Sequence, residues 1–221
     1  MKGLLLGILL IAILGIGGVV YRNAVEHPSQ PIVCPLDAIV CPDGTPISRV
    51  GSSCTFLACP PPNVSLSDIG IAFVLPDGFM SSSRPGDTGD LVMQYSMPVG
   101  SSTANITISR FMIETSPDST SSPQATALST IQQTAIGGAS GAPVSATSFS
   151  STVLGGHRFT VVSIERFEGV IDTAYYLARS TDVLRFDAID RGADWTNPSL
   201  NISTLPAHAA LRELLTTLQW Q

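Results

Sequence analysis

Residues 157–188 read HRFTVVSIERFEGVIDTAYYLARSTDVLRFDA, and this stretch decides the fold of the chain. Its segments 157–164, 171–179 and 183–188 have the pattern of β-strands, in which neighbouring side chains point to opposite faces. The residues Ser-Thr-Asp at 180–182 provide a turn between the last two segments. We therefore predict consecutive strands here, joined by short turns.

Further strands are predicted on the N-terminal side of this stretch. Apolar residues alternate on one face of residues 67–76, as in a half-buried strand, and Pro76-Asp77-Gly78 ends that strand. Three more strands are predicted at 90–97, 104–114 and 145–149.

Two helices are predicted, one in the middle and one at the end of the chain. Ser122 can cap the first helix, with Pro123 in its first turn and Gly137 beyond its end. Its expected buried stripe is Leu128, Ile131 and Ala135. The second helix is expected at 205–218, with Pro206 in its first turn and one face formed by Leu211, Leu214, Leu215 and Leu218.

This order of elements predicts the α+β fold class, with an antiparallel sheet packed with helices. It begins with a strand that runs into Leu75-Pro76-Asp77-Gly78-Phe79 and closes with a Leu-rich helix that runs into Thr217-Leu218-Gln219-Trp220. In this pattern of elements the chain resembles the PsbP-like α+β sandwich. The resemblance implies a fold, and a fold does not imply a function.

Residues 3–20, GLLLGILLIAILGIGGVV, form an uncharged apolar run. As a helix the run would span roughly 27 Å, close to the hydrocarbon thickness of a bilayer. A cleaved signal peptide is the alternative, but no small-x-small cleavage site follows the run. We predict an uncleaved transmembrane anchor in a single-pass plasma-membrane protein, with a cytoplasmic N-terminus and the bulk of the chain extracytoplasmic.

All four cysteines, Cys34, Cys41, Cys54 and Cys59, lie in one short segment. The gaps between them are six, twelve and four residues, unlike the close C-x2-C pairs typical of zinc sites. Two disulfide bonds are therefore preferred to a structural zinc ion, and disulfides persist in oxidising compartments. Four cysteines permit three connectivities, of which we favour Cys34–Cys54 with Cys41–Cys59.

This cysteine segment resembles two known kinds of module. Cys41-Pro42-Asp43-Gly44-Thr45, Arg49 and the residues 54–60, CTFLACP, are similar to a short C-P-D-G-[ST] module found behind membrane anchors in bacterial surface proteins. The segment also resembles the Cys…Asp-Gly…Cys core of Kazal-type protease inhibitors. That second resemblance implies protease inhibition through the Cys41–Cys59 loop.

The predicted organisation therefore has five parts. They are a transmembrane anchor at 1–22, a stalk at 23–33, a four-cysteine module at 34–60, a Pro-rich linker at 61–66 and an antiparallel α+β domain at 67–221.

Charge and composition exclude several functions. The chain carries 11 Lys and Arg against 17 Asp and Glu, a net charge of −6, which does not suit binding to nucleic acid. Lys2 is the only lysine, so residues 3–221 contain no lysine for a Schiff base or a phosphate loop.

No motif in the sequence assigns a catalytic, cofactor-binding or metal-ligating residue. His157 and His208 are candidates for a hydrolase, but neither accompanies a G-x-S-x-G motif. Asp187, Asp190 and Asp194 form the densest carboxylate group, which we interpret as a hydrated acidic loop rather than a cation site. Asp87-Thr88-Gly89 is interpreted as a solvated turn rather than an aspartic-protease triplet.

One aromatic pair offers a contact candidate. If strand alternation places Tyr175 inside, Tyr176 faces the opposite side and could contact a partner.

The sequence thus predicts a non-catalytic binding or assembly module of the bacterial cell envelope. Its expected partners are the membrane, through residues 3–20, and an envelope protein or a small-molecule ligand. The alternatives are a Kazal-like protease inhibitor and a hydrolase of unknown substrate that uses His157 or His208.

Overall fold

The computed structural model describes residues 7, 11, 13–19, 21–22, 33–41, 46–59, 61–82, 89–113, 122–137 and 141–221. The chain divides into two compact units. The smaller unit comprises residues 1–39 and 47–57, and the larger unit comprises residues 40–46 and 58–221.

The smaller unit contains most of a three-stranded sheet with the strand order β1-β2-β3. These strands are β1 (Ala38–Val40), β2 (Pro46–Val50) and β3 (Thr55–Phe56). Most side chains of β1 and β2 are exposed, so this sheet has little core of its own. Covalent cross-links are the usual remedy for so small a structure.

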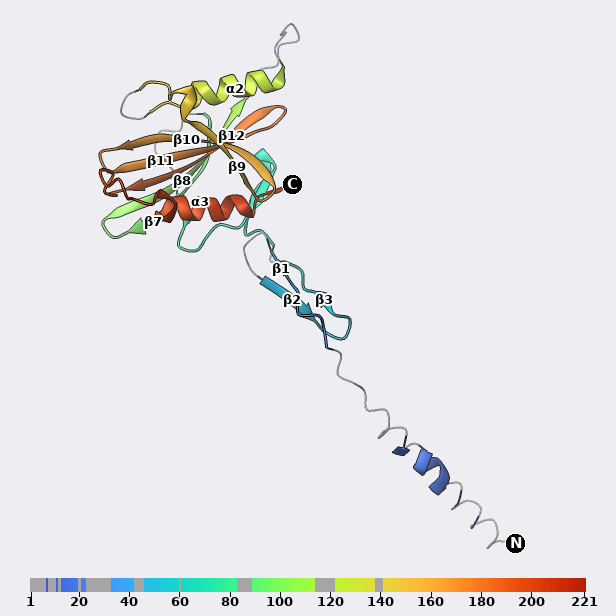
Figure 1. The fold of residues 1–221 in the computed structure, drawn as a ribbon. Helices are drawn as coiled ribbons and strands as arrows, with labels where there is room; N and C mark the ends of the chain where they lie inside the picture. Colours follow the sequence, from blue (N-terminus) through green and yellow to red (C-terminus); the bar gives the residue numbers. More distant parts are fainter. Residues whose placement is uncertain are drawn as a thin grey trace. The chain divides into compact units, whose positions relative to one another are not determined.

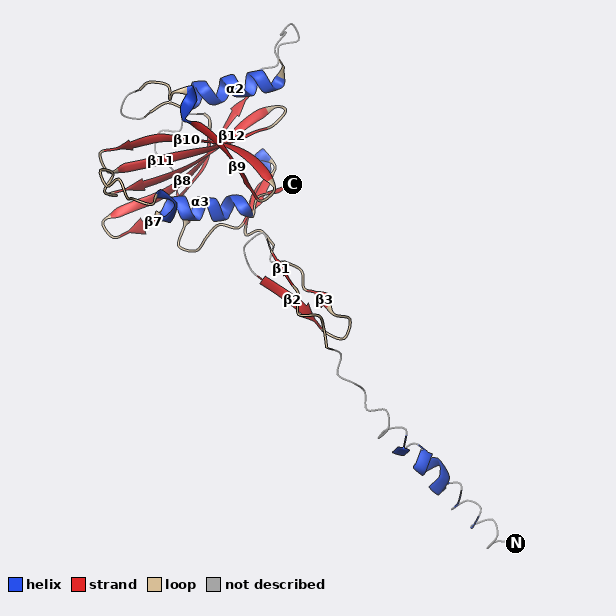
Figure 2. Cartoon of the chain, in the orientation of Figure 1, coloured by secondary structure: helices blue, strands red, loops and turns tan. Residues whose placement is uncertain are grey.

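The larger unit is built on a seven-stranded antiparallel sheet, the main sheet, with the order β6-β7-β8-β12-β11-β10-β9 (Figures 1 and 2). Its strands are β6 (Met80–Ser82), β7 (Leu91–Val99), β8 (Ser102–Met112), β9 (Phe149–Leu154), β10 (His157–Phe167), β11 (Val170–Ala178) and β12 (Asp182–Arg191). A second sheet has the order β13-β5-β4, formed by β13 (Gln219–Trp220), β5 (Ile71–Phe73) and β4 (Val64–Leu66).

The helices α2 (Pro123–Thr134) and α3 (Pro206–Thr216) lie on opposite sides of the main sheet (Figure 1). Under α3, the buried residues Leu211, Leu214 and Leu215 pack with Phe159 and Phe186 of the sheet. On the other side, the apolar residues of α2 pack against β10, β11 and β12. This second cluster includes Ala127, Ile131, Val162, Tyr176 and Val183.

The predicted strands of residues 157–188 are confirmed as β10, β11 and β12; β10 and β12 are longer than predicted, and β11 is shifted by one residue toward the N-terminus. The predicted strand 67–76 is a 3-10 turn, η1 (Ser67–Ile69), followed by β5, because Gly70 turns the chain with a φ of 63°. Residues 145–149 contain a second 3-10 turn, η2 (Ala146–Ser148), and β9 begins only at Phe149.

Both predicted helix beginnings are confirmed. Ser122 caps α2 by accepting a hydrogen bond from the backbone of Ala125, and Pro206 begins α3. The predicted stripe on α2 is wrong at one position, since Leu128 is 52% exposed and Ala127 is buried instead.

The predicted fold class, a sheet packed with helices behind a transmembrane helix, is wrong. The described chain is dominated by antiparallel strands, and its longest helix, α2, has 12 residues. A helix of that length covers about 18 Å, whereas an 11-residue strand such as β8 or β10 extends about 36 Å. The helices therefore cover only part of each sheet face.

No helix in the described part of the chain combines the length and apolar character needed to cross a bilayer. This finding contradicts the predicted anchor and the single-pass plasma-membrane location that depended on it.

Several predicted features lie outside the described residues. These are most of the stalk at 23–33, residues 42–45 of the C-P-D-G-[ST] motif, Pro60, and Asp87 with Thr88. The predicted domain boundaries stay predictions.

Candidate functional site

The face of the main sheet that α2 only partly covers contains a cavity of about 450 Å³, here called the sheet hollow. Its walls come from the strands β8, β10, β11 and β12, from the start of β7 and from the chain after α2. Seven of the lining residues have charged or hydroxyl side chains: Asp90, Thr107, Ser109, Asp172, Arg185, Asp187 and Arg191.

Strand register brings these side chains together. Alternate residues of β12 share a face, so Arg185, Asp187 and Arg191 all point to the side of the hollow. In the pairing of β12 with β8, Asp187 lies opposite Thr107 and Arg185 lies opposite Ser109. The floor of the hollow is therefore polar in the middle of the sheet.

A largely buried ion pair occupies this floor. The Nε of Arg185 donates to both carboxylate oxygens of Asp187, at 2.7 and 3.0 Å, and Thr107 donates its hydroxyl to Asp187 at 3.1 Å. The side chains of Arg185 and Asp187 are 16% and 6% exposed. Burial alone would lower the pKa of Arg185, but Asp187 raises that pKa, so the guanidinium stays charged.

Arg185 also joins the sheet to α2. Its Nη1 donates to the backbone oxygen of Thr134, the last residue of that helix, at 2.6 Å. A cation at this position is favourable because carbonyl groups at a helix C-terminus lack partners within the helix. Tyr176 lies beside it, with its ring centroid 5.6 Å from the guanidinium carbon.

A second polar cluster lies on the α3 side of the sheet. Its centre is His208, which is 2% exposed and whose Nδ1 is 2.6 Å from Oδ2 of Asp190. Its Nε2 is 3.0 Å from the hydroxyl of Thr173. A carboxylate only accepts hydrogen bonds, so Nδ1–H of His208 donates to Asp190, and Nε2 is left to form the hydrogen bond with the Thr173 hydroxyl.

Asp190 has a structural role in the same cluster. Its carboxylate accepts hydrogen bonds from the backbone nitrogens of Ala207 and His208, at 3.0 and 3.3 Å. These are early backbone N–H groups of α3, and the N-cap residue Leu205 provides no side-chain cap. Asp190 thus caps α3 from a neighbouring strand.

The two candidate histidines have different partners. The Nε2 of His157 is 3.2 Å from the backbone oxygen of Leu218, and its ring packs edge-on to Trp220 at 5.0 Å. Of the two, His208 is the histidine that contacts both a carboxylate and a hydroxyl.

The predicted acidic loop at 187–194 is in part a strand, since β12 continues to Arg191. The pleat sends Asp187 to the hollow and Asp190 to α3, and Asp194 accepts hydrogen bonds from Thr196 beyond the strand. The described residues contain no group of three or more His, Cys, Asp or Glu that could hold a metal ion.

Tyr175 and Tyr176 face opposite sides of the sheet, as alternation predicts. Tyr176 is nevertheless 1% exposed because α2 covers it, so it is not a surface contact residue. Burial raises the pKa of Tyr176 above its usual value.

Sequence reasoning missed Arg185, Thr107 and Thr173. Arg185 carried one local signal, since it stands two residues before Asp187 and therefore on the same face of a strand. Thr107 and Thr173 gave no such signal, because their partners are brought to them by strand pairing and by helix packing.

The predicted disulfide bonds are present, and they join Cys34 to Cys54 and Cys41 to Cys59. No free cysteine remains among the described residues.

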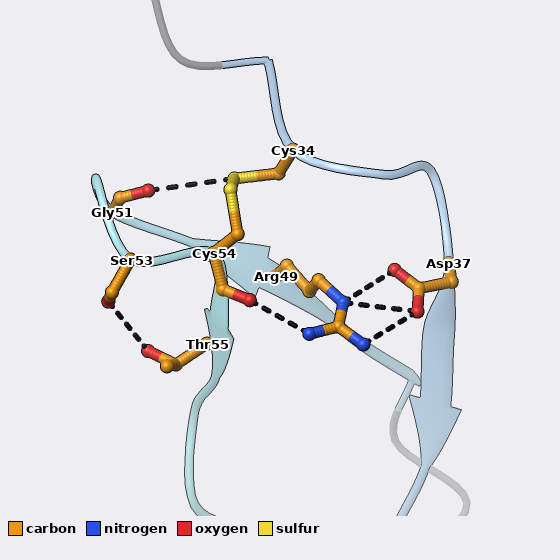
Figure 3. Close-up of a disulfide and its surroundings, with 7 residues drawn as sticks. All are labelled: Cys34, Asp37, Arg49, Gly51, Ser53, Cys54 and Thr55. Atoms are coloured by element: carbon orange, nitrogen blue, oxygen red, sulfur yellow. Dashed lines mark hydrogen bonds and ion pairs between the residues drawn. A yellow bond between two sulfur atoms is a disulfide. The ribbon is translucent and has the colours of Figure 1, made fainter.

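In the smaller unit, Arg49 organises the chain around the first disulfide (Figure 3). Its Nε donates to Asp37 at 2.8 Å and its Nη1 donates to the backbone oxygen of Cys54 at 3.0 Å. Its guanidinium carbon lies 4.2 Å from the ring centroid of Phe56. The hydrogen bonds from Arg49 lower the pKa of Asp37. Protease inhibition by this segment stays a prediction, because residues 42–45 lie outside the described chain.

No protein-family model matches the chain, and no curated protein matches it.

Two solved structures are similar in fold. One is a crystal structure of a protein from Bacteroides thetaiotaomicron, with 11% identity and a TM-score of 0.40 over 69% of this chain; the match spans 45% of that protein. The other is the solution structure of cyanobacterial PsbP (CyanoP) from Synechocystis, with 10% identity and a TM-score of 0.43 over 72% of this chain and 91% of that one. The second similarity agrees in part with the predicted PsbP-like resemblance. At these TM-scores neither similarity carries an argument about function.

Proposed function

We propose that the larger unit is a non-catalytic binding module and that the sheet hollow is its ligand site. The observation that carries this proposal is the buried Arg185–Asp187 pair on the floor of an open cavity. A buried ion pair is weak support for stability, since its desolvation cost offsets most of its attraction. A cavity of this size with a few convergent polar groups is typical of ligand sites.

The chemistry of the floor favours a small ligand that both donates and accepts hydrogen bonds. Each guanidinium nitrogen of Arg185 already contacts one protein acceptor. Nη1 and Nη2 each carry two N–H groups, so each of these nitrogens can donate a further hydrogen bond to a ligand. The whole lining carries three carboxylates and two guanidinium groups, which nearly balance, so strongly charged ligands gain little there.

A filling substitution tests the proposal. Ser109 lines the hollow opposite Arg185, and Ser109→Tyr would occupy the space without removing either charge. Ser163→Tyr is the matched control, because Ser163 is an exposed residue of the same sheet that does not line the hollow.

The probes are free amino acids, monosaccharides and nucleosides, and binding is followed by ligand-detected NMR and titration calorimetry. We expect at least one of them to bind with a Kd of about 1 mM or tighter, to be lost in Ser109→Tyr and to be kept in Ser163→Tyr. Absence of binding across the panel, or equal binding by both variants, contradicts the proposal.

The second candidate function is a hydrolase, which the Asp190–His208–Thr173 cluster favours. Carboxylate, imidazole and hydroxyl stand in the order that activates a nucleophilic oxygen in acyl transfer. In this proposal Thr173 attacks an ester carbonyl while its proton passes to Nε2 of His208. The proton then goes to the departing alcohol, and water releases the acyl group.

The test is hydrolysis of p-nitrophenyl acetate by the purified chain. The hydrolase proposal expects Thr173→Val to abolish turnover and Thr173→Ser, which keeps a hydroxyl, to retain it. If Thr173→Val and the unaltered chain have the same turnover, the hydrolase proposal is rejected. The binding module is then the function that remains.

A further inference from the structure

The strand β9 is an unpaired edge of the main sheet within the described chain. It pairs with β10 on one side and ends the strand order on the other. An edge strand presents a row of backbone N–H and C=O groups that can pair with another strand.

The turn before β10 shows which groups of β9 point outward. Gly155 and Gly156 have φ values of 55° and 82°, as in a type I′ turn, and Leu154 pairs with His157 across them. In such a hairpin the flanking pair exchanges both backbone hydrogen bonds, and the pairs then alternate along the ladder. The backbones of Val153, Ser151 and Phe149 therefore face away from β10.

This edge has none of the features that usually block strand addition. Natural edge strands are protected by charged side chains, prolines, bulges or very short length. The strand β9 is FSSTVL, without a charge or a proline, and its pairing with β10 is regular over six residues. The opposite edge strand, β6, has only three residues.

The chain that leads into β9 is also uncharged. Residues 119–156, which include all of α2 and β9, contain no Asp, Glu, Lys or Arg, although the chain has a net charge of −6. Exposed apolar side chains occur on the same stretch: Leu128, Ile136 and Val153 are 52%, 44% and 58% exposed. Depletion of charge with exposed apolar residues is typical of the centre of a protein interface.

We propose that β9 pairs with β9 of a second copy of this chain, antiparallel and about a twofold axis at Ser151. The sequence of the strand complements itself in this register. Ser151 meets its own copy, and Phe149 lies opposite Val153 of the other chain, so two apolar pairs flank a small polar centre. Two acidic chains also meet here without bringing like charges together.

The experiment measures the mass of the full 221-residue chain by light scattering and sedimentation over a range of concentrations. We expect a species of about twice the 23.1 kDa chain mass. Ser151→Lys would place two ammonium groups opposite each other at the axis and raise the dimer Kd at least tenfold. Ser81→Lys is the matched control, since Ser81 is an exposed serine on the other edge strand.

Ser151→Cys provides a second measurement that does not depend on weakening the interface. All four native cysteines are in disulfide bonds, so the new thiol would be the only free one. Facing residues of paired strands lie within disulfide reach, so mild oxidation should cross-link two chains, whereas Ser81→Cys should not cross-link.

Three outcomes overturn the proposal. They are a monomeric chain up to about 0.1 mM, a dimer that Ser151→Lys and Ser81→Lys weaken equally, and a dimer that survives Ser151→Lys in a folded protein. If the chain is monomeric, any strand that pairs with β9 would have to come from another protein, which is a different proposal.

Discussion

Asp190 and His208 join the main sheet to the beginning of α3. Oδ2 of Asp190 lies 2.6 Å from Nδ1 of His208, and the same carboxylate accepts hydrogen bonds from two backbone N–H groups of the helix. Both side chains are almost completely buried, at 5% and 3% exposed. One carboxylate thus satisfies three donors that water cannot reach.

Asp190→Ala should therefore destabilise the larger unit. Removing the acceptor leaves buried donors without partners, and we expect the free energy of unfolding to fall by about 3 kcal/mol. Urea unfolding followed by circular dichroism measures the change. Asp194→Ala is the control, because Asp194 is exposed and its carboxylate accepts from the nearby Thr196, so its cost should stay below about 1 kcal/mol. Equal losses in the two variants would contradict the role given to Asp190.

A second buried carboxylate makes stability depend on pH. Asp182 is 0% exposed and forms ion pairs with Arg179 and with Arg110, the latter at 2.6 Å. Burial alone raises the pKa of Asp182, but hydrogen bonds from Arg179 and Arg110 outweigh it and lower the pKa below its usual value.

The sign of the pH effect follows from this lowered pKa. Below about pH 4 the unfolded chain binds a proton at Asp182 before the folded chain does, so acid favours unfolding. The contribution of Asp182 should be complete above about pH 5 and decline below about pH 4. Asp182→Asn should lower the free energy of unfolding by about 3 kcal/mol at pH 7, and the difference from the unaltered chain should shrink in acid. A difference that stays constant down to pH 2 would refute this explanation.

The turn between β9 and β10 contains two adjacent glycines, Gly155 and Gly156, whose surroundings differ. Both have positive φ, so an alanine at either position costs about 1 kcal/mol in backbone strain. A Cβ on Gly155 would lie 2.6 Å from the backbone oxygen of Thr216 at the end of α3, whereas a Cβ on Gly156 meets nothing within 4 Å.

We expect Gly155→Ala to cost about 2–4 kcal/mol and Gly156→Ala about 1 kcal/mol in thermal or urea unfolding. The difference between the two isolates the contact with α3, since the strain is common to both. Equal costs would show that α3 moves away from the turn freely.

The two disulfide bonds should differ in their rate of reduction. Cys41 is 3% exposed and its partner Cys59 is partly exposed, whereas both Cys34 and Cys54 are partly exposed, so Cys34–Cys54 is the more accessible bond. Thiol attack requires access to a sulfur atom, so Cys34–Cys54 should be reduced before Cys41–Cys59. Brief treatment with dithiothreitol, alkylation and peptide mass spectrometry measures the order. Earlier alkylation of Cys41 and Cys59 would contradict it.

Local patterns predicted much of the sheet. The strands β10, β11 and β12 were found because alternation is a property of neighbouring residues, and the beginning of α2 was found because Ser122 and Pro123 are local signals. The same local reasoning failed at 67–76, where alternation continues but Gly70 turns the chain.

The sheet hollow could not be predicted in this way. Its floor joins Thr107 of β8 to Arg185 and Asp187 of β12, strands far apart in the sequence that pair in the fold. In the sequence, Asp187 and Asp190 look like members of one acidic group. In the structure, the pleat of β12 places Asp187 on the face of the hollow and Asp190 on the face that packs against α3.

The sequence by itself determined, to within two residues, where β7, β8, β10, β11, β12 and the helices α2 and α3 begin, together with the low charge of residues 119–156, because these depend on residue type and short-range periodicity. Tertiary structure decided which side chains meet. Strand pairing set the register that buries Arg185 beside Asp187, and the short length of α2 left that pair beneath an open cavity. Contacts of this kind depend on distances between elements, which no local pattern encodes.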